Sequence, residues 1–360
     1  MNKIIAMYLP QYHPTEDNDR WWGKGFTEWT NVAKARKLYP GHYQPKIPTE
    51  LGFYDLRMNE IREKQAELAK EAGVFGFCYY HYWFGNGKME LQLPLEEVVK
   101  TKEPDFPFCV CWANESWHKK FWNKDGAVAE KKLLVEQTYP GPEDEEQHFN
   151  YLLPMFQDSR YIKKDGKLLF LIYRPLDVKN VASFLKHWNE LAKESGLPGF
   201  YFVGVSFDVE KEYDQLKSYG FDAIFSCSAK RISTKNFTWF LNNVLRVLFL
   251  IPARYDFRKL YKHLLGEYEK RNDVYPLIIP NWDHTPRSEK NGYVFTHSEP
   301  AVFEKHVEYV LNAIKDKPED DKICFLKAWN EWGEGNYMEP DIKYGRGYIE
   351  TLKKVLEKYK

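Results

Sequence analysis

Two glutamates near the C-terminus have the spacing and setting of a glycosidase carboxylate pair. Glu331 and Glu334 are separated by two residues, and Gly333 and Gly335 beside them let the backbone turn and approach a ligand closely. Cleavage of a glycosidic bond needs one carboxylic acid to protonate the leaving oxygen and one carboxylate near the anomeric carbon. Neighbouring carboxylates also push each other's pKa values apart, so that one stays protonated near neutrality. We therefore expect Glu331 and Glu334 to be catalytic.

Polar and aromatic side chains gather at the C-terminal ends of the predicted strands. Ten of the twelve tryptophans lie there or in the loops that follow. Flat aromatic rings can stack on the C–H faces of sugars, whereas the alternative is aromatic packing under long loops. We expect the substrate to be an oligo- or polysaccharide bound by Gln11, Tyr80, His81, Tyr82, Trp83, Trp112, Asn114, Glu115, Arg174, Trp282, Asp283, Trp329 and Trp332.

The elements that must position these residues alternate between apolar strands and amphipathic helices. Such alternation is typical of a parallel sheet built from βα units. Eight units predict a (β/α)₈ TIM barrel with extended βα loops, forming a single catalytic domain over residues 1–360. Because the strand ends meet at one rim, we expect Glu331, Glu334, Glu115 and His81 to converge in one cleft there. A doubly wound open sheet is the alternative, but no GxGxxG or GxxxxGK[ST] loop follows a strand. The predicted strands are roughly 3–12, 73–83, 107–114, 167–174, 200–207, 221–228, 275–283 and 322–330.

Composition indicates which kind of partner is excluded and in which cellular compartment the protein is expected. Lys+Arg and Asp+Glu are both 52, and a formal charge of zero argues against a nucleic-acid partner. The odd number of cysteines, 5, all inside apolar runs, indicates reduced thiols in a cytoplasmic protein. The N-terminal residues predict a first strand and lack the features of a secretory signal.

No cofactor or metal is expected. A metal-dependent hydrolase using His13, His81, Asp283 and His284 is an alternative, but these residues lack a recognisable ligand pair.

Three long loops follow predicted strands on the side where barrel enzymes build active sites: 13–58, 115–142 and 229–258. Within the third, residues 237–251 predict an amphipathic helix that is too short to span a bilayer. We expect this helix to be a lid or a subunit contact. The alternative is a peripheral membrane contact through 237–251. The oligomeric state cannot be inferred from the sequence.

The segment 329–340 (WNEWGEGNYMEP) resembles the catalytic loop of glycoside hydrolase family 99, whose members are endo-acting α-mannosidases and mannanases with a (β/α)₈ fold. Nearly the whole chain is similar to the WbsX-like proteins of surface-polysaccharide gene clusters, which are often labelled glycosyltransferases. The motifs that carry this similarity are 8–13 (YLPQYH), 80–83 (YHYW), 112–115 (WANE) and 173–175 (YRP).

The resemblance implies a role for each glutamate. Glu334 would be the general acid and later the base for water. Glu331 would deprotonate the sugar 2-hydroxyl, giving a 1,2-anhydro intermediate and net retention. Family 99 usually has His where this chain has Gly333, and Thr-Gln-Ile where it has residues 336–338. The resemblance therefore does not identify which sugar is bound.

The expected function is a retaining glycoside hydrolase acting on a bacterial surface polysaccharide or a related one. The first alternative is a glycosyltransferase or transglycosylase of O-antigen or capsule biosynthesis, although no Asp-x-Asp motif ends a predicted strand. The second is a carbohydrate-binding barrel without catalysis.

Overall fold

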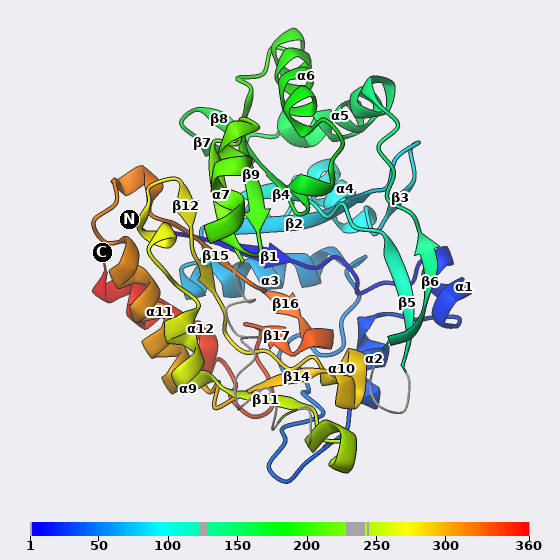
Figure 1. Ribbon diagram of the computed structural model, residues 1–360, viewed down its shortest axis with the longest axis vertical. Coiled ribbons are helices and arrows are strands. Elements are labelled where there is room, and N and C mark those ends of the chain that lie inside the picture. The colour runs from blue at the N-terminus through cyan, green and yellow to red at the C-terminus, as the bar shows by residue number, and fades with distance from the viewer. Residues whose placement is uncertain (1, 123–127, 228–241, 243–244, 360) are drawn as a thin grey trace.

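A computed structural model describes residues 2–122, 128–227, 242 and 245–359 (Figure 1). Its main sheet is parallel and runs in the order β12-β10-β9-β8-β4-β2-β1-β15-β13. These strands confirm the predicted (β/α)₈ barrel, and each lies in or next to a predicted strand. Their bounds are β1 (Lys3–Tyr8), β2 (Gly76–Trp83), β4 (Phe108–Trp112), β8 (Lys167–Ile172), β9 (Phe200–Ser206), β10 (Ala223–Ser226), β12 (Val274–Tyr275), β13 (Leu277–Ile278) and β15 (Ile323–Leu326).

The barrel closes at a strand that proline divides. β12 pairs with β10 and β13 pairs with β15, so the short run 274–278 joins the two ends of the sheet. Pro276 between them has no N–H to donate, but its carbonyl accepts a hydrogen bond from Phe325 N at 3.0 Å. The predicted seventh strand, 275–283, therefore ends earlier than expected and is broken once.

Helices cover the outside of the barrel (Figure 1). The predicted helix after Pro300 is confirmed, and Gly73 ends the first covering helix in the left-handed conformation with φ 82°. Trp188 on α6 is fully buried, with its ring 4.9 Å from Phe170 and 5.5 Å from Phe200. The covering helices are α3 (Asn59–Ala72), α4 (Leu93–Thr101), α5 (Pro142–Phe156), α6 (Val181–Glu194), α7 (Val209–Ser218), α11 (Pro300–Ile314) and α12 (Gly347–Lys358).

The three long loops contain structure of their own. The loop after β1 forms two short helices, α1 (Glu16–Trp22) and α2 (Glu28–Lys34). The loop after β4 forms an antiparallel hairpin of β5 (Trp117–Trp122) and β6 (Val128–Val135), which lies near α1 in Figure 1. After β10, strand β11 (Ala253–Asp256) pairs in parallel with β14 (Tyr293–Thr296).

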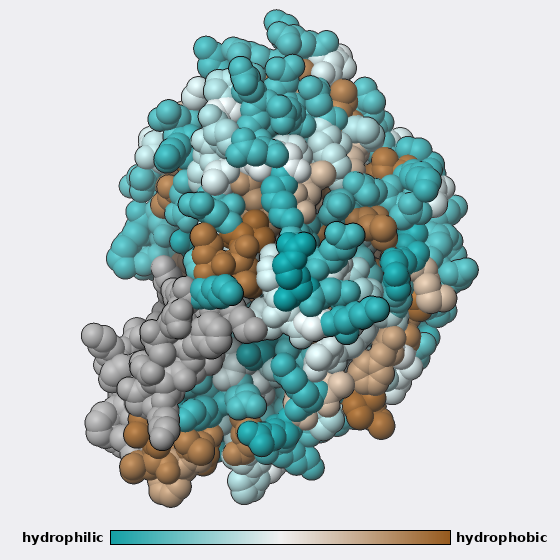
Figure 2. Space-filling view, turned by 90° about the vertical axis from the view of Figure 1, so that its right-hand side faces the viewer, coloured by the Kyte–Doolittle hydropathy of each residue, from teal (hydrophilic) through white to brown (hydrophobic). Residues whose placement is uncertain are grey.

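The predicted amphipathic stretch is only partly described. Residues 237–241, 243 and 244 lie outside the described residues, and 245–249 are helical. Val247, Leu248, Phe249 and Leu250 are each at least half exposed. Most of the face in Figure 2 is hydrophilic, with hydrophobic residues gathered in separate patches, one at the lower edge. In the described part of the chain, no helix is both long and apolar enough to cross a membrane.

Candidate active site

The two predicted catalytic glutamates lie on a tight loop after β15. β16 (Asn330–Glu331) and β17 (Asn336–Tyr337) pair antiparallel around a 3₁₀ turn, Trp332–Glu334. Gly333 lies against Glu28 of α2, where a Cβ would come 1.7 Å from the carboxylate oxygen Oε2. The loop can therefore approach α2 only with glycine at this position.

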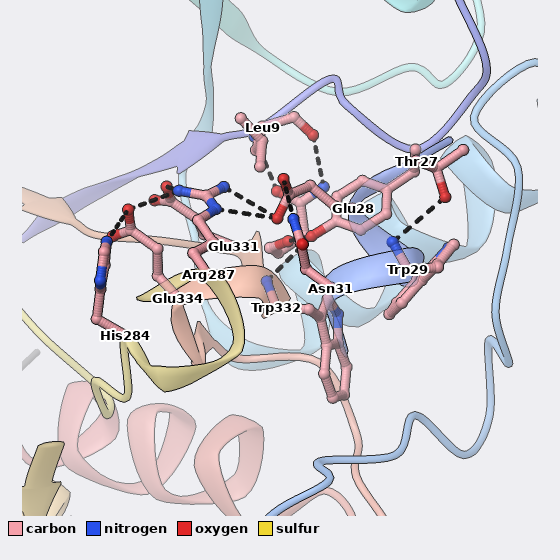
Figure 3. Close-up of polar contacts among 12 residues, drawn as sticks. Leu9, Thr27, Glu28, Trp29, Asn31, His284, Arg287, Glu331, Trp332 and Glu334 are labelled. Carbon is pink, nitrogen blue, oxygen red and sulfur yellow. Dashed lines mark hydrogen bonds and ion pairs between the residues drawn. The ribbon is translucent and has the colours of Figure 1, made fainter. Parts of the chain in front are cut away.

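Arg287 links both glutamates to a third carboxylate (Figure 3). Its Nη1 lies 2.6 Å from Glu334 Oε1 and 3.2 Å from Glu331 Oε1. Its Nε and Nη2 each lie 3.1 Å from Glu28 Oε2. His284 Nε2 is a further 3.4 Å contact of Glu334 Oε1. One guanidinium therefore neutralises carboxylates from two loops that are distant in the sequence.

The environments of the two catalytic candidates push their pKa values in opposite directions. Burial, and then the charge of Glu334, raises the pKa of Glu331. Glu331 Oε2 is buried without a hydrogen-bond partner among the described residues. Burial alone would raise the pKa of Glu334 as well, but the charge of Arg287 and the contact with His284 hold it well below its usual range. In the free protein Glu331 is therefore the better placed of the two to hold a proton, the reverse of what the resemblance implies for the reacting complex.

Arg287 is held in place by the segment that precedes it. Asp283 Oδ1 accepts hydrogen bonds from Thr285 N at 3.0 Å and Oγ1 at 2.6 Å, where α10 (Thr285–Ser288) begins. Its other oxygen, Oδ2, lies 2.8 Å from both His42 Nε2 and Gln44 Nε2. Asp283, expected to bind substrate, therefore has both carboxylate oxygens engaged in the protein.

The same segment binds the backbone of the loop that carries Glu331 and Glu334. Asp283 N donates to Glu334 O at 2.8 Å. Lys46 Nζ donates to Gly335 O at 3.0 Å and to Asn281 Oδ1 at 3.1 Å. Burial lowers the pKa of Lys46. These bonds satisfy two carbonyls of the loop and fix the position of the backbone that carries the glutamates.

Glu339 supports the loop from the other side. Its carboxylate accepts hydrogen bonds from Trp332 Nε1 at 2.6 Å, Gln65 Nε2 at 2.6 Å and Tyr54 OH at 3.0 Å. The Trp332 ring stacks on Tyr337 with centroids 3.7 Å apart. Burial raises the pKa of Glu339 to about 7. The sequence-predicted sugar contact Trp332 is therefore a buried support of the loop.

A cleft of about 830 Å³ opens over the glutamates. It brings together three of the four residues expected to converge, Glu331, Glu334 and Glu115 but not His81, and it has room for more than one sugar ring. Of the predicted residues, its lining includes Gln11, Tyr82, Asn114, Glu115, Glu331 and Glu334. It also includes residues that were not predicted to bind substrate, among them Trp22, Glu28, Trp117, Gln137, His284 and Arg287.

Several predicted residues do not line this cleft, and for His81 and Trp83 the reason is that alternate residues of a strand point to opposite faces. On β2, Tyr82 faces the cleft, whereas His81 faces α5 with its Nε2 2.9 Å from His148 Nε2. The Trp83 ring stacks on His148 at 4.7 Å. The prediction that His81 joins the glutamates in the cleft is therefore wrong. The other predicted residues that do not line this cleft are Tyr80, Trp112, Arg174, Trp282, Asp283, Trp329 and Trp332.

Most tryptophans near the strand ends pack inside the protein, so the aromatic-packing alternative accounts for them. Of the described ones, Trp22 and Trp117 line the cleft. Trp21 packs edge-on against Trp117 at 5.9 Å. The buried tryptophans in this group are Trp29, Trp83, Trp112, Trp282, Trp329 and Trp332.

Two residues at the centre of the site were not predicted from the sequence. Glu28 and Arg287 are 259 positions apart, and neither belongs to a motif that predicts the contact. Their positions in the loops after the first and seventh predicted strands were the available signal, since such loops meet at one end of a barrel. Among the described residues, no three His, Cys, Asp or Glu side chains are grouped so that they could hold a metal ion.

Comparisons with known proteins agree on the family and the fold. A family model described as Glycosyltransferase WbsX matches residues 4–352. The protein WxcX from two strains of Xanthomonas campestris pv. campestris, itself described as uncharacterized, is 30% identical over 354 and 362 residues. These alignments cover 98% of this chain but 49% of the relative, so the chain spans about half the length of the curated relatives it matches.

Solved structures share the fold at low sequence identity. A glycoside hydrolase family 99 endo-α-mannosidase from Bacteroides thetaiotaomicron is 15% identical, covers 99% of this chain and 96% of its own, and has a TM-score of 0.57. A glycoside hydrolase-like protein is 13% identical, covers 98% and 93%, and has a TM-score of 0.59. These similarities support the TIM-barrel fold.

Removal of the Arg287 charge tests whether this side chain stabilises the three carboxylates that it contacts. We expect Arg287→Met to lower the free energy of unfolding at pH 7 by about 3–5 kcal/mol, because three partly buried carboxylates lose their partner. Urea denaturation measures this. Arg36→Met is the matched control, since Arg36 is exposed and pairs loosely with Glu289 at 3.8 Å. Equal losses in the two variants would contradict the assignment.

The pH dependence of stability tests Glu339. Its pKa rises from 4.5 to about 7 on folding, so between these values only the folded protein holds the proton. This contribution to stability is complete below pH 4.5 and is lost as pH rises through about 7. In the unsubstituted protein the free energy of unfolding should fall by about 3 kcal/mol between pH 4.5 and 8 because of this group. We expect this fall to be absent in Glu339→Gln, as measured by urea denaturation at a series of pH values. Glu267→Gln, at an exposed glutamate, should leave the profile unchanged; an unchanged profile in Glu339→Gln would count against the assignment.

Proposed function

This chain belongs to the Glycosyltransferase WbsX family, and from that starting point we propose that its cleft cleaves glycosidic bonds in a bacterial surface polysaccharide or a related one. The observation that carries the proposal is the pair Glu331 and Glu334, held on one guanidinium nitrogen of Arg287 in the cleft of a barrel. Such a pair supplies the acid and the base that glycosidic cleavage needs. It acts without a metal or cofactor in this proposal.

The geometry supports a retaining reaction. Both carboxylates contact the same Nη1 of Arg287, at 2.6 and 3.2 Å. They are therefore held closer than the roughly 6.5–9.5 Å with which inverting enzymes leave room for a water molecule. In the proposed reaction Glu334 protonates the leaving oxygen, and Glu331 deprotonates the 2-hydroxyl, which attacks the anomeric carbon to form a 1,2-anhydro sugar.

These roles require the order of the two pKa values to reverse when substrate binds. In the free protein burial raises the pKa of Glu331, whereas the charge of Arg287 holds the pKa of Glu334 below its usual range. A sugar hydroxyl that accepts the Nη1 hydrogen bond in place of Glu334 would raise the pKa of Glu334. If the roles were reversed, with Glu331 as the acid, no such change would be needed.

The description of the family as a glycosyltransferase favours one alternative, the transfer of a glycosyl group. The same carboxylate pair could pass the glycosyl group to a sugar acceptor instead of water, which would make the protein a transglycosylase. A sugar-nucleotide-dependent transferase would instead need a donor with a nucleotide leaving group. Product analysis with and without a sugar-nucleotide donor separates these reactions.

We also propose that the protein acts in the cytoplasm. Its five cysteines are all buried and free, as expected of a protein in a reducing compartment. A lid or subunit contact through 237–251 stays the expectation, with a peripheral membrane contact as the alternative. The exposed apolar residues of the described part, 247–250, are compatible with either.

Substitution of the glutamates tests the proposal. We expect Glu334→Gln and Glu331→Gln each to lower product release from a panel of bacterial surface polysaccharides and α-mannan by about 10²–10⁴-fold. Mass spectrometry of the released sugars, with a chelator present throughout, is the measurement. Glu190→Gln is the control and should keep full activity, since Glu190 is an exposed residue of α6 that does not line the cleft and pairs with Lys186 at 3.7 Å.

An aryl glycoside with a good leaving group then assigns the roles, because it needs no acid. It should restore turnover to the variant that lacks the acid and not to the variant that lacks the base. Wild-type rates in Glu334→Gln on an identified polysaccharide would disprove the proposal.

A further inference from the structure

A second cavity, of about 620 Å³, shares a segment with the catalytic cleft. His284 and Arg287 line the cleft, whereas Asp283, Phe295 and Thr296 line the second cavity. Nothing in the proposed reaction uses this cavity. Its chemistry can therefore be considered separately.

Aromatic rings, not carboxylates, hold two cations of this cavity. The Arg254 guanidinium lies 5.0 Å over the ring of Tyr39. Lys343 Nζ lies 4.7 Å from the ring centroid of Tyr43 and 4.6 Å from that of Tyr344. In the described part of the chain, no carboxylate oxygen lies within ion-pair distance of either cation. A contact with a ring face leaves the N–H donors of a cation free to bind an anion.

Two of the carboxylates that line the cavity are already engaged. Arg258 binds Asp256 through Nε at 2.9 Å and Nη2 at 2.7 Å. Asp283 has His42 and Gln44 on one oxygen, as described above. The remaining carboxylate is Glu299, which precedes α11, and the lining also includes a third cation, Lys46. Three cations and three carboxylates of the described residues therefore line the cavity. What favours an anion is the lack of a carboxylate partner on Arg254 and Lys343 among the described residues, not a surplus of charge.

The rings that hold the cations also pack against neighbouring rings, which fixes their positions. Tyr39 and the buried His42 are stacked 4.4 Å apart with an interplanar angle of 11°. Tyr43 and Tyr344 meet edge to face at 6.0 Å. The two cations are therefore held at defined places in the lining of the cavity.

We propose that this cavity binds a saccharide that carries an anionic substituent, a carboxylate or a phosphate, at a site separate from the catalytic cleft. The anionic group pairs with Arg254 and Lys343, and the sugar ring lies in the space between the tyrosine side chains that line the cavity. The volume is sufficient for a saccharide of one or two rings. This assignment does not depend on which reaction the cleft performs.

Calorimetric titration of the whole chain tests the site without using turnover. The probes are sodium glucuronate and glucose 1-phosphate, with glucose as the neutral analogue and inorganic phosphate as the free anion. We expect saturable binding of at least one acidic sugar, at least about tenfold tighter than glucose and tighter than phosphate. Arg254→Met and Lys343→Met should each weaken it about tenfold or more, whereas Lys186→Met, at an exposed lysine of α6, should not.

The same titrations can overturn the proposal. Absence of saturable binding by both acidic sugars would do so, as would equal binding of glucose. Equal affinity for glucose 1-phosphate and inorganic phosphate would overturn the saccharide part. Unchanged binding in a folded Arg254→Met, Lys343→Met double variant would exclude this cavity as the site, with thermal unfolding as the check on folding.

Discussion

Three carboxylates meet one guanidinium at the mouth of the barrel, and the surrounding loops are arranged around that contact. Glu28 comes from the loop after β1, and Glu331 and Glu334 come from the loop after β15. Without Arg287 their charges would repel one another in a partly buried place. The cation therefore brings the two loops together and decides which glutamate keeps its proton.

The Arg287 contact depends in turn on buried polar residues. Asp283 and Lys46 bind the carbonyls of Glu334 and Gly335, and Glu339 holds the Trp332 side chain from the opposite side. Each of these groups is costly to bury alone, but together they satisfy one another and leave the loop few alternatives. The loop is therefore preorganised, as a site that stabilises a transition state requires.

The strands could be predicted because both of their faces are buried, which makes each an apolar run. The break at Pro276 depends on which strands flank it, so periodicity could not place it. The pair Glu331 and Glu334 was visible because both residues lie in one loop. The Arg287 contact with Glu28 is purely tertiary, so local spacing carried no signal for it. His81 was placed on the wrong face although the two-residue period of a strand, with Tyr82 in the cleft, could have corrected it.

The charges near the paired carboxylates oppose one another before any substrate enters. Lys327 lies 5.0 Å over the Trp282 ring, and although burial lowers its pKa, the nearby Tyr173, Tyr80 and Glu331 raise it well above the usual range. Arg287 contacts the carboxylates of Glu28, Glu331 and Glu334, and Lys327 is a second cation near Glu331. An anionic sugar at the point of cleavage would meet these carboxylates at close range. The reacting ring is therefore expected to be neutral. An acidic group elsewhere on the glycan would be better placed in the second cavity, where Arg254 and Lys343 have no carboxylate partner among the described residues.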